Sequence, residues 1–265
     1  MDRNKFIDIF ASEVVRITVG KDDKQRKFSI HKDLFTRKAP AFHKMFDGSF
    51  KEGVTGLATL PDDNVEAFEV FTNWLYLSIM DKFVCFPQLF PHQDLSTIPW
   101  VIVETIVFAD KYFMDELSDL AMTTWCIYRY SIPSVAELKK VTGYIVANSS
   151  PLCKFRAYLA RIWAWEILQR PENDPYNPHG ADLDAFIKDR NFAIQVYNEM
   201  SCLHRQSREN DTLKGRPLCY YHHHGEGVYC CGIIDHCLPP DKAMKTAAVN
   251  PKASVSKPVK KRKLT

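Results

Sequence analysis

The sequence predicts an α/β protein of the α+β type: a small sheet capped by helices, then a mainly helical C-terminal half and a disordered basic tail. Three observations predict it. Near the N-terminus, apolar and polar residues alternate in two segments, which is the spacing of half-buried strands. After Leu34 most apolar residues recur every three or four positions, as in amphipathic helices. From Lys242 the sequence is basic and of low complexity, a composition typical of disorder.

The first strands are predicted from residues 14–30. The segment 14–19 reads VVRITV, and its alternation indicates one buried and one exposed face. The polar run 20–25 predicts a hairpin turn, after which Phe28 and Ile30 continue the alternation in a returning strand.

Helical spacing follows, interrupted by one further strand. Pro40 opens the second of two helices, since proline suits a first helical turn. Residues 57–60 predict a short third strand. Asp63 and Glu66 are spaced like a capping box and predict the start of a long helix. The apolar face of that helix consists of Phe68, Phe71, Leu75 and Ile79.

The rest of the chain is predicted to be mainly helical. Residues 83–97 contain two prolines and little periodicity, which indicates an inserted loop. Residues 98–114 are apolar nearly all round, so we expect a buried helix there. Further helices are predicted at 115–128, 132–143, 154–169 and 182–205, with a proline-rich linker before the last.

Several motifs of the N-terminal half resemble the BTB/POZ family. The opening strand reads EVVRITVG, and the returning strand ends in Phe28-Ser29-Ile30-His31-Lys32. The second helix carries Phe42-x-x-Met45-Phe46, followed by Phe50-Lys51-Glu52, and the long helix carries Phe71-x-x-Trp74-Leu75-Tyr76. Their order and spacing together are specific. Residues 132–167 and the late CYYHHH resemble, more loosely, the C-terminal half of fungal BTB proteins.

The resemblance implies a domain organisation and a kind of activity. It covers a BTB/POZ domain at 10–129, which would be followed by a helical region at 130–240, ending in a Cys/His-rich segment, and by the tail at 241–265. BTB domains bind other proteins: they dimerise, or they dock onto a cullin scaffold and present a client for ubiquitination. No clear extra strand precedes Val14 and no known substrate-reading module follows, so cullin docking and dimerisation both stay open.

From this resemblance we expect a substrate adaptor for a cullin-type ubiquitin ligase, not an enzyme. The expected scaffold-binding face lies around the second helix and the helix after the insertion, while the C-terminal half would hold an unknown client. The residues expected on that face are Phe42, Met45, Phe46 and Tyr112. The alternatives are a nuclear, transcription-related or homodimerising scaffold without a ligase role, and, from another class, a zinc-dependent enzyme or nucleic-acid binder.

Composition limits the function classes. The formal net charge is +3, but residues 241–265 hold eight basic residues and one acidic residue, so residues 1–240 carry −4. An acidic body argues against nucleic-acid binding, which needs a basic folded face. The longest apolar run, 98–109, is too short to cross a membrane. The first ten residues lack an apolar signal sequence, so we expect an intracellular protein with eight reduced cysteines.

A Cys/His-rich segment between 219 and 237 is the one candidate metal site. It contains eight cysteines and histidines, and zinc needs about four such ligands in a tetrahedral array. The spacing matches no standard zinc finger. The alternative is that these side chains simply pack a C-terminal strand or loop against the helical half, with no cofactor. The ligands for a structural zinc would come from Cys219, His222, Cys230, His236 and Cys237.

A compact basic run ends the chain. Its members are Lys260, Lys261, Arg262 and Lys263, and they follow a proline in the tail. Such a run predicts a nuclear localisation signal, against the alternative of a solvated tail. We therefore expect the protein in the nucleus, the cytoplasm or both.

Overall fold

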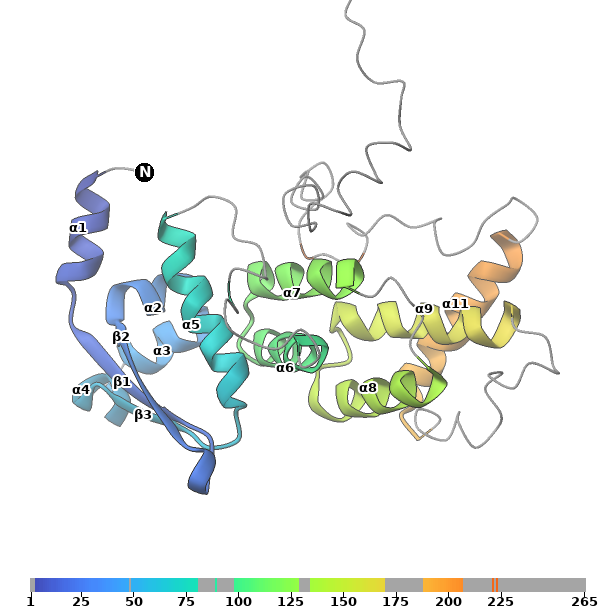
Figure 1. The fold of residues 1–265 in the computed structure, drawn as a ribbon, viewed down its shortest axis with the longest axis horizontal. Helices are drawn as coiled ribbons and strands as arrows, with labels where there is room; N and C mark the ends of the chain where they lie inside the picture. Colours follow the sequence, from blue (N-terminus) through green and yellow to red (C-terminus); the bar gives the residue numbers. More distant parts are fainter. Residues whose placement is uncertain are drawn as a thin grey trace, which may run out of the picture.

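The computed structural model describes residues 3–47, 49–80, 89, 98–128, 134–169, 188–206, 221 and 223. The protein is a helix-rich α/β structure with one three-stranded sheet among these residues. The elements of the N-terminal half are α1 (Arg3–Ala11), β1 (Val14–Val19), η1 (Asp22–Lys24), β2 (Arg26–His31), α2 (Lys32–Lys38), α3 (Pro40–Asp47), α4 (Lys51–Thr55), β3 (Leu57–Leu60) and α5 (Val65–Met80). Those that follow are α6 (Ile98–Lys111), α7 (Asp115–Tyr128), α8 (Val135–Asn148), α9 (Lys154–Gln169) and α11 (Arg190–Gln206). The sheet lies at one end of the molecule and α8, α9 and α11 at the other (Figure 1).

The sheet has the strand order β2-β1-β3. β1 is antiparallel to β2, with Val15 opposite Ile30, and parallel to β3, with Ile17 opposite Ala58. The inward residues of β1 are almost fully buried and the alternate ones are more exposed, as the sequence predicts.

The turn after β1 depends on a glycine. Gly20 has φ +85°, a conformation that residues with a Cβ rarely adopt. A Cβ built there would lie 2.9 Å from Cγ2 of Val65 at the start of α5. The hairpin therefore approaches α5 too closely for any larger residue.

An aromatic core fills the space between the sheet and its helices. Phe35 of α2, Phe42 of α3 and Phe71 of α5 are fully buried, with ring centroids 4.4–6.0 Å apart. The ring of Phe28 on β2 lies 4.7 Å from that of Phe68 on α5 and connects the sheet to this core.

The start of α5 differs from the predicted capping box. Asn64, not Asp63, caps the helix, since its Oδ1 accepts a hydrogen bond of 3.0 Å from the N–H of Ala67. Asp63 instead accepts bonds from Lys111 Nζ at 2.9 Å and Tyr112 Oη at 2.6 Å at the end of α6. The capping prediction was wrong because the carboxylate is drawn into a tertiary contact 48 residues away.

α6 is the central helix and packs against α5, α7 and α8. No side chain from Val101 to Asp110 is exposed, which confirms the buried helix over this stretch. The helix ends at Lys111 and not at residue 114, and Phe113 beyond its end is 75% exposed. α7 and α9 have the predicted bounds.

Charged pairs hold the helical half together. Arg156 and Arg161 of α9 are 1% and 3% exposed. Arg156 pairs with Asp189 before α11, and Arg161 pairs with Glu199 on α11, each at 2.9 Å. α9 and α11 pack along each other through these contacts.

Two other predicted elements need correction. α8 runs to Asn148 and not to Gly143, because the fully buried Ile145 anchors a further turn. The short helix α4 is not predicted by the sequence, in which Phe50-Lys51-Glu52 stands only as a family motif. The last helix, predicted from 182, is described from Arg190, and residues 182–187 lie outside the described part.

The inserted loop, the tail and the predicted domain boundary at 129/130 also lie outside the described residues. Leu89 is the exception within the loop: it is buried, and its carbonyl accepts a bond of 2.8 Å from Asn73 Nδ2.

Candidate functional site

Four exposed apolar side chains lie on or just before α4 and on the neighbouring strands β1 and β3. These residues, which we call the α4 patch, are Phe50, Val54, Leu57 and Val14. Their exposed fractions are 64%, 78%, 52% and 50%. Apolar side chains gathered on a surface mark interaction sites more often than singly exposed ones do.

Local structure explains why these side chains come together. Phe50 precedes α4 and Val54 lies four residues later, so both reach the same side of this short helix. Gly56 ends the helix in the left-handed conformation at φ +66°. The Gly56 carbonyl then accepts a hydrogen bond of 2.8 Å from the N–H of Arg16, which places Leu57 beside β1.

Three of the four residues expected on the partner face lie in the core. Phe42 is 0%, Phe46 1% and Tyr112 8% exposed, and the Phe42 and Tyr112 rings stack at 4.4 Å. Met45 is half-buried. The family resemblance predicted these side chains on an exposed face, but Phe42 and Phe46 lie on the buried side of α3 and Tyr112 is buried just after α6. We therefore assign all three to the core.

Sequence reasoning did not identify the α4 patch as a surface. Phe50 was noted only as part of a family motif, and Val54, between Gly53 and Thr55, belongs to no periodic pattern. The available signal was that two large apolar residues fall in a segment with neither strand nor helix periodicity.

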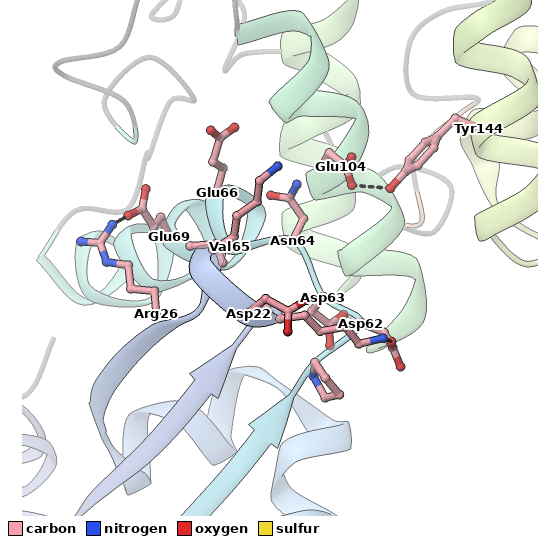
Figure 2. A pocket seen from close by; sticks show the side chains of 14 residues that line it. Asp22, Arg26, Asp62, Asp63, Asn64, Val65, Glu66, Glu69, Glu104 and Tyr144 are labelled. Atoms are coloured by element: carbon pink, nitrogen blue, oxygen red, sulfur yellow. Dashed lines mark hydrogen bonds and ion pairs between the residues drawn. The ribbon is translucent and has the colours of Figure 1, made fainter.

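A polar groove of about 830 Å³ lies between the hairpin end, the start of α5, and α6 and α8. Figure 2 shows Arg26 and Glu69 at one side and Glu104 with Tyr144 at the other. Its acidic residues outnumber its basic ones by six to three. The acidic set is Asp22, Asp62, Asp63, Glu66, Glu69 and Glu104, and the basic set is Lys21, Lys24 and Arg26.

Several of the groove carboxylates form ion pairs or hydrogen bonds with other residues that line the groove. Glu69 pairs with Arg26, and Asp62 pairs with Lys21. Tyr144 donates a hydrogen bond to Glu104; burial and this bond raise the pKa of Tyr144, which therefore stays protonated. The lining contains no serine, cysteine or histidine. The groove offers a negative surface and no nucleophile–base pair of the Ser–His or Cys–His kind.

His31, which belongs to one of the family motifs, lies at the junction of β2 and α2. It occupies the position just before the helix, but its side chain makes no capping bond. Its Nδ1 lies 2.9 Å from Tyr76 Oη on α5. It therefore acts as a structural link between two helices.

The cysteines expected to be reduced are described in part. Cys153 is buried, and burial raises the pKa of its thiol to about 11, which disfavours the reactive thiolate. Cys126 is half-buried, and Cys85 lies outside the described residues.

The candidate zinc ligands Cys219, His222, Cys230, His236 and Cys237 all lie outside the described residues, as do Lys260 to Lys263 of the basic run. Within the described part, no three His, Cys, Asp or Glu side chains are grouped so that they could hold a metal.

Two residues of the Cys/His-rich segment are described, and both contact the helical half. Tyr221 is 4% exposed and its ring lies edge-on to Tyr158, with centroids 5.3 Å apart. His223 bonds to Asp119, and this hydrogen bond raises the pKa of His223. These contacts follow the packing alternative of the sequence analysis.

None of the described helices is both long and apolar enough to cross a membrane. Comparison with protein-family models and with curated proteins finds no match for this chain.

Proposed function

We propose that this protein is a protein-interaction adaptor whose N-terminal half docks onto a cullin-type scaffold through the α4 patch. The observation that carries the proposal is the exposure of Phe50, Val54, Leu57 and Val14 over an otherwise closed aromatic core. The N-terminal half has the element order β1, β2, α2, α3, α4, β3 and α5, and the motifs that resemble BTB domains lie on or beside β1, β2, α3, α4 and α5.

The α4 patch has the chemistry of a partner surface. Burying an exposed phenylalanine or valine side chain against a partner contributes about 1.5–3 kcal/mol. Aromatic residues are also over-represented among the side chains that dominate binding energy. Phe50 is the one aromatic residue of the patch, and we expect it to be the main anchor.

In this mechanism the protein performs no covalent chemistry. The N-terminal half binds the scaffold, the helical half binds a client, and the ligase acts on the client because the adaptor raises its effective concentration. The two halves share α6, which packs against both α5 and α8, so a client would be held at a fixed position relative to the scaffold.

The test is direct binding of the full chain to a purified cullin N-terminal domain. We expect micromolar or tighter binding, weakened at least about tenfold by Phe50→Ala, a loss of about 1.4 kcal/mol. Tyr197→Ala is the matched control, since Tyr197 is 69% exposed but lies on α11. Circular dichroism establishes that each variant is folded.

Two results would reject the adaptor proposal: no binding by the folded chain, or equal binding by the Phe50→Ala variant. Sedimentation of the same samples tests the alternative of a homodimerising scaffold. A dimer dissociated by Phe50→Ala, together with no cullin binding, would assign the α4 patch to self-association.

We also propose that the basic run Lys260 to Lys263 directs the protein to the nucleus. The support is its sequence alone: four consecutive cations after a proline. A fluorescent reporter fused to residues 249–265 is expected to accumulate in the nucleus, and one in which the four residues are alanine is not. Cytoplasmic retention of the first reporter would reject the signal.

A further inference from the structure

A short segment far along the chain is bound on α7 and α9. The backbone N–H of His223 donates to both carboxylate oxygens of Asp119, at 2.9 and 3.0 Å. The His223 ring nitrogen Nδ1 lies 2.7 Å from the same carboxylate, and Nε2 lies 4.0 Å from Oδ1 of Asp115. Asp119 therefore binds both the backbone and the ring of His223, which is 104 positions away in the sequence.

Tyr221 supplies a second anchor, two residues before the first. Its ring meets Tyr158 of α9 edge-on at 5.3 Å, with an interplanar angle of 86°. The Tyr158 ring stacks on Phe155 at 5.8 Å, and Phe155 meets Trp125 of α7 at 5.3 Å. The tyrosine thus extends an aromatic series that begins between the two helices.

Together these contacts have the features of a peptide-docking site. One aromatic side chain is buried in an aromatic surface, and one charge-assisted clamp fixes the direction of the backbone. Tyr158 contacts Tyr221 and Asp119 contacts His223, which is two residues further along the chain. The site should therefore bind only segments in which the two side chains have this spacing.

We propose that Asp119, Asp115 and Tyr158 form a docking site for peptide segments with a tyrosine two residues before a histidine, and that Tyr221 and His223 fill it in cis. Only the biological role of this site rests on the proposed adaptor function. In that role, a client that carries such a segment would have to displace Tyr221 and His223 from the site. Docking itself is measured without a scaffold.

The first experiment measures occupancy in cis on the full chain. Hydrogen exchange is followed for the backbone amide of His223. We expect protection in the unaltered protein and at least tenfold faster exchange in the Asp119→Ala variant. Glu116→Ala is the matched control, because it removes an exposed carboxylate from the same helix, and it is expected to leave the protection unchanged. Equal exchange in the unaltered and Asp119→Ala proteins would overturn the docking.

The second experiment measures binding in trans. The probe is the peptide Ala-Tyr-Ala-His-Gly with both termini blocked, and its binding is followed by saturation-transfer NMR. The peptide is titrated up to about millimolar concentration, because a short tether gives an attached segment an effective concentration of about that size. We expect it to bind the Tyr221→Ala, His223→Ala full chain at least tenfold more tightly than the unaltered chain, whose site is filled. Adding Asp119→Ala should abolish this binding, and a peptide with Tyr and His adjacent should not bind.

Two outcomes would overturn the peptide-site proposal. Equal binding to the filled and emptied chains would place the peptide elsewhere on the surface. No binding to the emptied chain would mean that Tyr221 and His223 stay in place only because the rest of the chain holds them near the site. An unaltered protein that sediments as a dimer, with a monomeric emptied variant, would assign the segment to a second copy and overturn occupancy in cis. None of these results depends on cullin binding.

Discussion

The two halves of the molecule differ in the kinds of side chain that they bury. Around the sheet, the core contains stacked aromatic rings, such as those of Phe35, Phe42 and Phe71. In the helical half, α9 buries two arginines, and each needs a carboxylate from the α11 segment. Apolar packing tolerates many arrangements of similar volume, whereas a buried charge is acceptable only opposite its partner. We infer that volume mainly determines the first half and that charge placement determines how α11 pairs with α9.

The largest expected effect is the loss of an aromatic ring from the first core. Phe71 is fully buried, and its ring lies within about 6 Å of several others. Phe71→Ala removes these contacts and leaves a cavity, so we expect the free energy of unfolding to fall by about 3–5 kcal/mol. Urea denaturation measures it. Phe71→Leu, which retains most of the apolar volume, should cost less than about 1.5 kcal/mol. If both variants lost the same amount, cavity formation would not be the cause.

A smaller loss is expected when one buried charge loses its partner. Arg156→Met leaves Asp189 without its cation and also removes weak bonds to the carbonyls of Val146 and Ser149. Breaking a fully buried pair costs about 3–5 kcal/mol, and because Asp189 is partly exposed we expect about 2–3 kcal/mol.

A double-mutant cycle separates charge from packing at this pair. Asp189→Asn keeps a side-chain oxygen that can still accept the bond from the N–H of Phe192. Adding it to Arg156→Met should therefore restore part of the lost stability. Strictly additive losses in the cycle would show that the pair is not coupled, and the contrast drawn between the two halves would then fail.

At an exposed helix end of the same half, the expected loss is about 1 kcal/mol. Ser134 and Glu137 form a complete capping box at the start of α8: Ser134 Oγ accepts from the N–H of Glu137, and Glu137 accepts from the N–H of Ser134. Ser134→Ala removes one half of this exchange. Thermal unfolding would measure the change, and Ser134→Asp, which keeps an acceptor, should retain most of the stability.

The sequence predicted those features that depend on local periodicity. The alternation in β1 and β2 and the largely apolar sequence of α6 each reflect the burial of whole faces, which can be recognised within a single segment. Asp63 shows where this stops. Its spacing to Glu66 fits a cap, but Lys111 and Tyr112, which bind its carboxylate, are distant in the sequence. A local sequence pattern cannot predict a contact with a residue that lies in a distant helix.

The candidate surfaces show the same limit more strongly. Phe46 and Phe50 are phenylalanines four residues apart, yet one is 1% and the other 64% exposed. Phe46 lies on the buried side of α3, which ends at Asp47, whereas Phe50 lies beyond that helix and just before α4. The binding of His223 by Asp119 joins residues 104 positions apart and left no local signal beyond the composition of the Cys/His-rich segment.

The smallest expected effect on stability belongs to the α4 patch and makes the clearest contrast with the core. Phe50→Ala removes a side chain that mainly contacts solvent, so the free energy of unfolding should change by no more than about 0.5 kcal/mol. The same substitution four residues earlier, Phe46→Ala, should cost about 3–5 kcal/mol. Urea denaturation of the two variants gives the comparison. If Phe50→Ala were as damaging as Phe46→Ala, Phe50 would be part of the fold, and weakened scaffold binding by that variant could not be attributed to a lost contact. If its stability is unchanged, the aromatic ring at this position has no role in folding, and weakened scaffold binding by the variant would report the loss of a direct contact.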